Sequence, residues 1–313
     1  MNEKAKGYLL AVIAATTYGM NPLFALPLYA DGMNPDSVLF FRYLFAIPLV
    51  GAMLKTRRGS DFHVQRKDLL PLAVLGILVA LSSLTLFEAY NYMDAGIAST
   101  ILFVYPIMVA LIMAAIYKEK VTVQTGLCLL LALSGIAMLY QGGDGITLSL
   151  TGTLLVFASA LSYAIYIVGV NRPSLKEMAT LKVTFYVLLF GVLLFVVRLW
   201  ASHDLTLPSQ WWLWGNLLAL AVFPTAISFL CTTSAIQRIG STPTAILGAL
   251  EPVTAIFFGI TVFGERLTAR DCMGITLILV AVTVVVAGGS ITHQLVRLRK
   301  MFPRLPLKKK GKG

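Results

Sequence analysis

The sequence predicts an all-α integral membrane protein, with ten transmembrane helices arranged as two inverted five-helix repeats around a central cavity. Composition is the first reason: 58% of the 313 residues are hydrophobic and 12% are charged, whereas soluble domains have about 25% charged residues. Apolar runs long enough to cross a bilayer, roughly 20 residues each, are the second. The third is an internal repeat, since Pro252 and Glu265 follow Pro106 and Glu119 at the same offset of 146 residues.

Five apolar runs form the first half of the chain. A transmembrane β-barrel is excluded because these runs are too long and lack a two-residue alternation. A basic start with Lys4 and Lys6 imitates a secretory signal, but the first run is too long for its apolar region. The expected helices cover about Gly7–Tyr29, interrupted by Asn21-Pro22 and Pro27, then Asp36–Leu54, Leu69–Tyr92, Gly96–Tyr117 and Thr122–Tyr140.

The second half follows the same plan after a glycine-rich polar boundary at Gln141–Leu150. Its helices are expected at about Thr151–Val170, Thr180–Trp200, Trp211–Ile236, Thr242–Phe263 and Ala269–Gly288. The domains are therefore a first repeat over residues 7–140, a second repeat over 151–288 and a basic tail over 289–313.

The repeat extends beyond the proline-containing helices. Gly7-Tyr8-Leu9-Leu10 aligns with Gly152-Thr153-Leu154-Leu155 at an offset of 145 residues. Because each half has an odd number of helices, the second half must enter the membrane upside down relative to the first. This is the pattern of an inverted-topology repeat, with a pseudo-two-fold axis in the membrane plane.

The basic residues predict the orientation. With the N-terminus in the cytoplasm, the inner segments hold 21 of the 25 Lys and Arg residues, so both termini are expected to be cytoplasmic. The net charge of +11 is thus read as a topology signal of a multi-pass protein of the cytoplasmic membrane, and no nucleic-acid partner is predicted. The tail is either a solvated anchor or a segment that lies along anionic lipid.

Pro106 and Pro252 each lie about ten residues into their expected helices, roughly 15 Å deep and so close to the bilayer midplane. A proline removes a backbone donor and bends the helix. Freed backbone groups at that depth are tolerated only against protein or a water-filled cavity. The two prolines therefore mark either packing kinks or the wall of a cavity.

Glu251 precedes Pro252, and the matching residue of the first half is Tyr105, so the symmetry fails at this position. An acid near the midplane is a functional candidate. Glu251 would bind a cationic group or take up a proton; otherwise it is a buried acid satisfied by neighbouring hydroxyls. Glu88, near the end of its helix, lies either at the cavity mouth or at the interface. Arg42 is expected to snorkel to the surface rather than bind a ligand.

Polar and aromatic side chains gather on the first, third, sixth and eighth helices. With the proline-containing helices they are expected to enclose a polar cavity, although hydrogen bonding between packed helices explains any single Ser or Thr equally well. Besides Glu88, Tyr105, Pro106, Glu251 and Pro252, the predicted cavity residues are Tyr18, Asn21, Ser82, Ser159, Ser162, Tyr163, Tyr166, Ser228 and Thr232.

Catalytic and metal chemistry is not predicted. The three cysteines lie inside apolar runs without zinc-ligand spacing, and the three histidines lie in loops or the tail. No phosphate-binding loop with the Gly-x-x-x-x-Gly-Lys-Ser/Thr pattern occurs. We therefore expect no metal and no cofactor, and a membrane-embedded enzyme remains only a remote alternative.

The two repeated helix ends, Glu119-Lys120-Val121-Thr122 and Gly264-Glu265-Arg266-Leu267-Thr268, together with Pro106 and Glu251-Pro252, resemble the EamA family of the drug/metabolite transporter superfamily. The resemblance covers about Gly7–Gly288 and departs where Lys118 replaces the glycine. Read locally, Thr122 and Thr268 would cap the following helices and both glutamates would be structural.

This resemblance implies a secondary transporter with a central cavity and alternating access, which exports amino acids or similar small metabolites. A flippase of a lipid-linked metabolite is the nearer alternative. The partners implied are a small-molecule substrate and the lipid bilayer. Substrate identity, the coupling ion, the direction of transport and the oligomeric state are left open.

Overall fold

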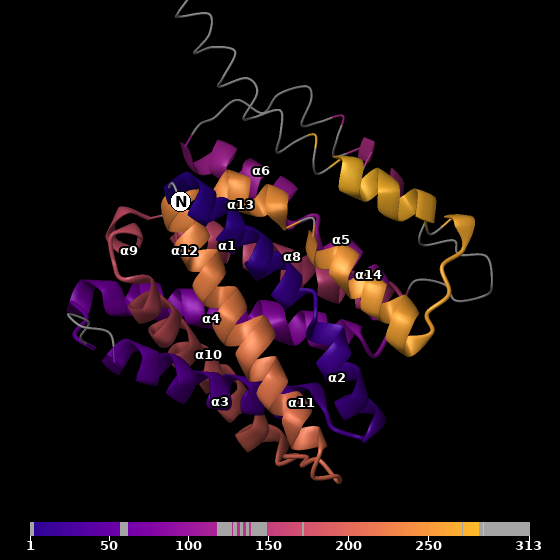
Figure 1. The fold of residues 1–313 in the computed structure, drawn as a ribbon, viewed down its shortest axis with the longest axis horizontal. Coiled ribbons are helices and arrows are strands. Elements are labelled where there is room, and N and C mark those ends of the chain that lie inside the picture. Colours follow the sequence, from indigo (N-terminus) through magenta and orange to yellow (C-terminus); the bar gives the residue numbers. More distant parts are fainter. Residues whose placement is uncertain are drawn as a thin grey trace, which may run out of the picture.

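A computed structural model describes residues 3–56, 62–117, 149–170, 172–248, 250–270 and 272–281, with positions 127, 130, 131, 134, 135, 138 and 284. Every element within these residues is a helix. Figure 1 shows the helices packed as one bundle. The predicted helix at Thr122–Tyr140, the end of the last helix and the basic tail lie largely outside the described residues.

Between Glu3 and Tyr117 the structure describes six helical segments of the first half. The run predicted at Gly7–Tyr29 is interrupted at Gly19 and Met20, as expected from Asn21-Pro22. Pro22 lies in the first turn of the second segment, where a missing N–H costs nothing. The segments are α1 (Glu3–Tyr18), α2 (Asn21–Ala30), α3 (Pro35–Thr56), α4 (Arg66–Ala89), α5 (Ala95–Leu102) and α6 (Tyr105–Tyr117).

The second half contains α8 (Leu150–Val170), the short α9 (Pro173–Lys176), α10 (Thr180–Ser202), α11 (Leu213–Leu220), η1 (Ala221–Ile227), α12 (Ser228–Ile239), α13 (Ser241–Leu247), α14 (Leu250–Phe263) and a last helix at Cys272–Ala281. The segments α11, η1 and α12 form one continuous helix. Its central turn has π geometry and contains Pro224, which cannot donate a backbone hydrogen bond.

The two proline-containing helices are broken rather than only bent. In the first half the break lies at Phe103 and Val104, directly before Pro106. In the second half it lies between Leu247 and Leu250. Interrupted helices at corresponding positions are typical of transporters that contain internal repeats.

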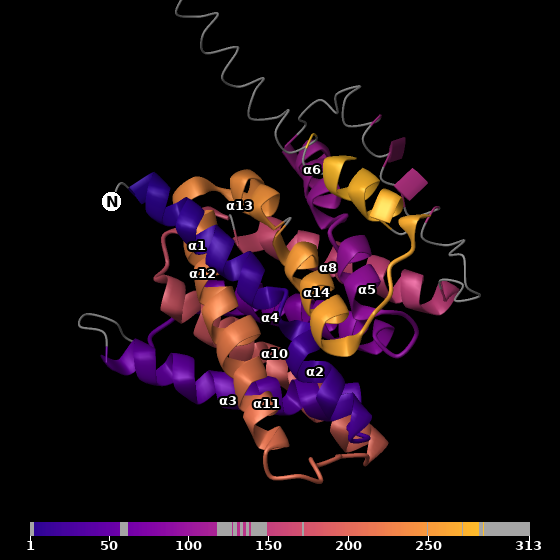
Figure 2. The same cartoon turned by 45° about the vertical axis from the view of Figure 1, so that its right-hand side comes forward.

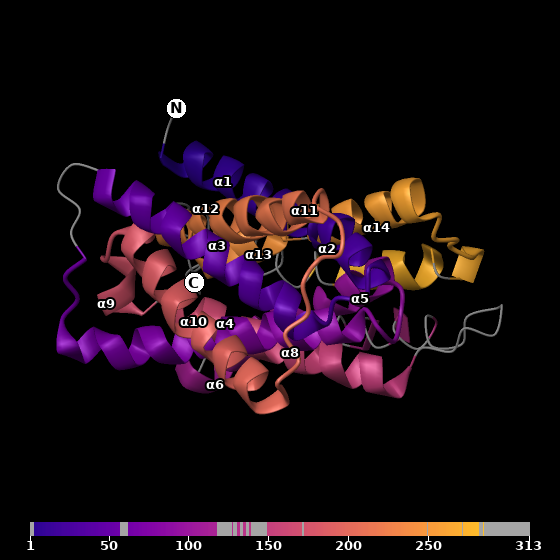
Figure 3. The same ribbon diagram turned by 90° about the horizontal axis from the view of Figure 1, so that it is seen from below.

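Four pairs of helices make the most extensive contacts among the described residues: α4 with α8, α4 with α10, α1 with α12, and α3 with α10. Figure 1 and Figure 2 both show α1 running alongside α12. The helix α10 packs on α3 and α4, and α14 packs on α5. Figure 3 shows α1, α12, α13 and α14 toward one side of the bundle, and α4, α6, α8 and α10 toward the other.

Six helices among the described residues are long and apolar enough to cross a membrane, and three shorter apolar helices accompany them. Much of their apolar surface faces outward, including Leu49, Ile77, Leu193 and Phe257. A soluble monomer rarely exposes such large apolar areas. The protein is therefore a multi-pass membrane protein.

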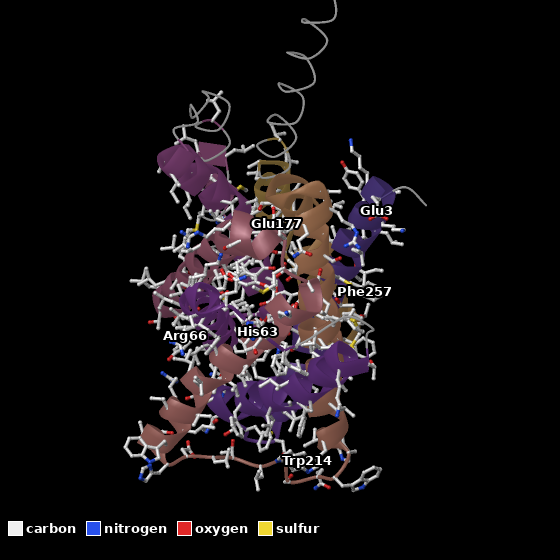
Figure 4. All side chains as sticks on the ribbon, turned by 90° about the vertical axis from the view of Figure 1, so that its left-hand side faces the viewer. Glu3, His63, Arg66, Glu177, Trp214 and Phe257 are labelled. Atoms are coloured by element: carbon white, nitrogen blue, oxygen red, sulfur yellow. The ribbon has the colours of Figure 1, made fainter. Side chains whose placement is uncertain are left out.

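Polar contacts between helix ends define the two ends of the bundle. At one end Arg198 of α10 reaches Asp36 of α3 at 2.6 Å and Glu88 of α4 at 3.8 Å; we call it the Asp36 end. At the other end Arg238 of α12 reaches Glu3 of α1 at 3.1 Å; we call it the Glu3 end. Figure 4, seen from the left of Figure 1, labels Glu3 and Trp214, which lie far apart.

Candidate functional site

A small cavity lies in the middle of the bundle, where the two broken helices that contain Pro106 and Pro252 meet α1, α8 and α12. Its volume of about 20 Å³ is enough for about one water molecule. The lining residues come from all these helices: Ala11, Ala14, Ala15, Tyr18, Tyr105, Tyr163, Ile167, Ser228, Thr232, Thr244, Ala245, Gly248 and Glu251. Six of them were predicted from the sequence.

Aromatic rings form one wall of this cavity. Tyr163 packs edge-on against Tyr105 at a centroid distance of 4.8 Å and stacks on Tyr18 at 6.1 Å. Tyr166 stacks on the far side of Tyr163 at 5.9 Å, and Phe229 stacks on Tyr18 at 6.3 Å. Tyrosine faces carry negative electrostatic potential, so such a wall attracts a cationic group.

The one acidic residue of the cavity lining is Glu251, the second residue of α14. Its side chain is 5% exposed, and its backbone N–H donates to the Gly248 carbonyl at 2.9 Å, across the break between α13 and α14. No described residue forms an ion pair with it. An acid at this depth is costly and therefore a functional candidate.

At two of the helix breaks, a glycine lies in close contact with a residue of another broken helix. A β-carbon at Gly19, in the break of the first helix, would collide with the Glu251 carbonyl and with Thr254. A β-carbon at Gly248, in the break between α13 and α14, would collide with the Tyr105 hydroxyl. Three broken helices therefore meet at the cavity, and glycine is what allows two of these contacts.

Hydroxyl groups of the cavity differ in their partners. Ser228 of α12 donates to the Ala14 carbonyl of α1 at 2.9 Å and so ties these two helices together at the cavity wall. Thr232 lies one turn further along α12 and is also buried. Ala11, Ala14 and Ala15 were not predicted from the sequence, although they lie seven, four and three residues before Tyr18 and so share one helix face with it.

Other predicted residues lie outside the cavity lining. The hydroxyls of Ser82 and Ser159 bond to each other at 3.0 Å, and Ser159 donates to the Ser82 carbonyl at 2.7 Å. They join α4 to α8, which is the packing role weighed as the alternative. Ser162, Tyr166, Pro106 and Pro252 are buried nearby without lining the cavity.

Two further predicted residues have different positions. Glu88 is not at the cavity but at the Asp36 end, where it faces Arg198. Asn21 is 1% exposed at the start of α2, and neither its amide nitrogen nor its amide oxygen has a hydrogen-bond partner among the described residues. Asn21 is thus an unsatisfied polar group beside the break of the first helix.

The expectation that Arg42 snorkels to the surface is wrong. Its side chain is fully buried in α3. Nε donates to the Thr225 hydroxyl at 2.5 Å, and one terminal nitrogen donates to the Pro224 carbonyl at 3.1 Å. The π turn at Pro224 provides these acceptors, and sequence reasoning could not place it opposite α3. A charged residue inside an apolar run was the available signal.

Glu265 links the two broken helices that contain Pro106 and Pro252, at the Asp36 end. Its carboxylate accepts hydrogen bonds from the backbone N–H groups of Ala95 and Gly96 at the start of α5. Burial, and then the charge of Asp94, raises the pKa of Glu265 to about 7, while these two hydrogen bonds lower it. A β-carbon at Gly259 would collide with this carboxylate. The equivalent Glu119 and Thr122 lie outside the described residues.

Comparison with known proteins gives a consistent family. The model of the EamA-like transporter family matches residues 5–141 and again residues 150–287. Relatives include the uncharacterized transporter YcbK of Bacillus subtilis, which is 22% identical over 88% of this chain and 90% of its own length. The uncharacterized inner membrane transporter YicL of Salmonella typhimurium is 24% identical over 91% of this chain and 96% of its own.

A more distant organism provides a third relative. An uncharacterized transporter of Archaeoglobus fulgidus is 26% identical over 89% of this chain and 95% of its own length. The fold also matches a solved crystal structure with a TM-score of 0.66, at 18% identity, over 94% of this chain and 99% of that one. This last likeness concerns the fold alone.

Proposed function

The chain belongs to the EamA-like transporter family, and from this premise we propose that it is a secondary transporter that exports amino acids or similar small metabolites. The observation that carries the proposal is the central cavity. Three tyrosines and Glu251 face it from four helices, and three of these helices are broken there. A buried site with one acid and a few hydroxyls, between interrupted helices, fits a small polar substrate.

The architecture that we propose is ten helices in two inverted repeats, over residues 7–140 and 151–288. The two separate family matches support it. The packing supports it too. Among the ten predicted helices, α1 belongs to the first and packs on α12 of the eighth. In the same way, α8 of the sixth packs on α4 of the third. These pairs exchange under a two-fold rotation that relates the halves. The helix α1 starts at the Glu3 end, whereas Gly152 of α8 packs on Tyr92, which follows α4 at the Asp36 end.

Transport by alternating access requires the cavity to change size. At about 20 Å³ the cavity is too small for an amino acid, so substrate entry must move its walls. The breaks at Gly19, at Phe103 and at Gly248 are the places where helix halves can tilt with little loss of hydrogen bonds. We propose that these breaks are the bending points that open the cavity toward one end and then the other.

We further propose that the Glu3 end faces the cytoplasm, in the inner membrane, with both termini on that side. The count of basic residues supports this orientation. All four tryptophans support an interface at the Asp36 end, because they lie at the end of α10 and the start of α11 and are exposed. Trp and Tyr are enriched at membrane–water interfaces. The name of the Salmonella relative also supports the inner membrane.

Glu251 is the proposed coupling group. It is the only acid among the residues that line the cavity, and it has no described ion-pair partner. Substrate and proton would compete for this carboxylate, so that proton entry drives substrate exit. Tyr105 holds the equivalent place in the first repeat, so the two halves differ where a directional step would act.

A second candidate function is flipping of a lipid-linked metabolite. One observation favours it: an apolar groove of about 260 Å³ lies between α4, α8 and α9 toward the Glu3 end. Exposed Leu70 and Val74 line it, and Arg172 is its charged residue. The groove is separate from the central cavity, so the two candidates predict sensitivity to different substitutions.

Metabolite profiling of the culture medium tests the export proposal. Cells without the gene would carry the wild-type protein, the Glu251→Gln variant, an Arg172→Gln variant or an empty vector. We expect one class of amino acids to rise selectively with the wild type and not with the variant. An unchanged medium would contradict export, and a change that depends on Arg172 rather than Glu251 would favour the lipid-linked substrate.

A further inference from the structure

Arg42 is a fully buried cation whose guanidinium is only partly satisfied. The side chain is 0% exposed, and its terminal nitrogen Nη1 is buried with no hydrogen-bond partner. Among the described residues no carboxylate lies within ion-pair distance of it. A buried charge without a counter-charge is strongly unfavourable, so such residues persist in membrane proteins where they serve a ligand or an ion pathway.

The rest of the guanidinium is held in place. Nε donates to Thr225 at 2.5 Å and Nη2 donates to the Pro224 carbonyl at 3.1 Å. The Thr225 hydroxyl donates in turn to the Leu220 carbonyl at 2.7 Å. Phe87 and Tyr18 cover the planar group, with ring centroids 5.3 and 5.8 Å from its central carbon. The fork is therefore fixed while one donor edge stays unused.

A purely structural arginine would use that edge too. Buried polar groups are almost always hydrogen-bonded, and each exception calls for an explanation. The π turn at Pro224 aligns two acceptors for Arg42, and π turns of this kind often occur at functional sites. A carboxylate is the group that a planar guanidinium edge recognises best.

Tyr18 separates this guanidinium from the central cavity. Its ring contacts Arg42 and it also lines the cavity with Glu251. Tyr18 is the last residue of α1, and the break at Gly19 and Met20 follows it directly. A tilt of α1 about this break would move the Tyr18 ring and open a path between the Arg42 guanidinium and the cavity.

We propose that Arg42 receives the carboxylate group of the transported substrate. The inference rests on the proposed function and narrows its substrate class to zwitterionic amino acids and closely related carboxylates. Once the Tyr18 ring has moved aside, the ammonium group of the same substrate faces the tyrosine wall and Glu251. Positive and negative groups of the substrate thus meet opposite charges on two different helices, α3 and α14.

The test measures binding separately from flux. Purified protein in detergent is melted with a panel of amino acids and with the matched amines that lack the carboxylate, such as leucine with isoamylamine and phenylalanine with phenethylamine. The variants are Arg42→Gln and Arg42→Lys, with Arg238→Gln as the control, since Arg238 is an exposed arginine at the Glu3 end. The same compounds are then followed in proteoliposomes.

We expect at least one amino acid to stabilise the wild type and Arg238→Gln in preference to its matched amine. Removing one partner of a buried, hydrogen-bonded charge pair should weaken the amino acid about 30-fold or more in Arg42→Gln, while the amine is unaffected. Arg42→Lys should be intermediate, because lysine keeps the charge and loses the planar fork. If Arg42→Gln does not fold, Arg42→Lys and Thr225→Val carry the comparison.

The proposal would be overturned if the Arg42 variants were still stabilised more by an amino acid than by its matched amine, to the same extent as the wild type. A wild type that prefers the amines, or one that no carboxylate of the panel stabilises, would also overturn it. If amino acids bind through Arg42 but no flux occurs in proteoliposomes, the carboxylate site stands and the proposed transport function fails. Flux that is insensitive to Arg42 is the reverse outcome and leaves the transporter without this site.

Discussion

The hydroxyl group of Tyr105 packs against Gly248 so closely that a β-carbon at position 248 would collide with it. Tyr105 begins α6, just after the break between α5 and α6, and Gly248 lies in the break between α13 and α14. The two breaks thus touch each other across the cavity. Their contact couples the halves of the protein at the place where we propose that substrate binds.

This contact predicts the effect of a single methyl group. Gly248→Ala should force the breaks apart and lower stability by about 1–3 kcal/mol, as expected for overpacking. It should also slow substrate flux in proteoliposomes, because the closed cavity no longer forms. Combining it with Tyr105→Phe removes the obstructing oxygen and should restore a substantial part of both properties.

The matched control for this pair is Gly215→Ala on α11. A β-carbon there meets nothing within 4 Å, and replacing a helical glycine by alanine should be neutral or stabilising by about 0.5–1 kcal/mol. A Gly248→Ala variant with wild-type melting temperature and flux would disprove the importance of the contact. Absence of any rescue by Tyr105→Phe would disprove its stated cause.

Glu265 predicts a pH dependence of stability. Burial and Asp94 raise the pKa of Glu265 to about 7 from an ordinary value of 4.5. The folded state then binds more protons than the unfolded state between these values, so the contribution of this group should fall as the pH rises from about 4.5 to 7 and should level off above. Melting of wild type and Glu265→Gln across this range measures it.

Glutamine keeps one acceptor oxygen for the N–H groups of Ala95 and Gly96 and cannot ionise, so the variant removes the titrating charge with little change in shape. We expect the melting temperature of Glu265→Gln to change less with pH than that of the wild type, with the gap widening toward pH 7 in favour of the variant. Asp94→Asn should remove part of the same dependence. Parallel pH profiles for wild type and Glu265→Gln would show that this carboxyl group is not the origin.

Ser82 and Ser159 are predicted to stabilise packing and to leave transport unchanged. Their mutual hydrogen bond joins α4 to α8 away from the cavity lining. Ser82→Ala, Ser159→Ala and the double variant should give a coupling free energy of about 0.6 kcal/mol in a double-mutant cycle. A large loss of flux in well-folded single variants would instead place these hydroxyls on the substrate path.

Gly76 of α4 is predicted to be a packing position between two membrane helices. A β-carbon there would approach the Val187 carbonyl to 2.7 Å and Phe190 to 2.8 Å, both on α10. Small residues let membrane helices come this close. Gly76→Leu should therefore lower the melting temperature or prevent folding, measured by size-exclusion chromatography after heating. A well-folded Gly76→Leu protein with an unchanged melting temperature would contradict the close crossing.

Much of the membrane architecture followed from the sequence, because long apolar runs have few alternatives in lipid. The six long spans overlap the runs that were predicted, with ends that differ by a few residues, and the breaks lie close to Pro106, Pro252 and Asn21-Pro22. The effect of a proline on its helix can be predicted locally, because proline lacks a backbone N–H donor in any tertiary context. The gathering of Tyr18, Tyr105, Tyr163 and Glu251 followed from the same reasoning about symmetry-related helices.

The position of Arg42 did not follow. Whether a charged side chain in an apolar run turns to the interface or into the bundle depends on the neighbouring helices, and the acceptors of Arg42 are 182 and 183 positions away in sequence. The same holds for Glu88, whose partner Arg198 comes from α10. The hydropathy pattern therefore could not predict which side chains become partners through tertiary packing.

The most direct test of the central claim replaces Glu251 by Gln and measures substrate flux in proteoliposomes with and without a pH gradient. Tyr105→Phe serves as the matched control on the opposite wall of the cavity. We predict that Glu251→Gln abolishes the acceleration by the pH gradient while exchange between loaded vesicles and medium persists, and that Tyr105→Phe keeps the acceleration. Flux of Glu251→Gln that still responds to the pH gradient as the wild type does would contradict the account.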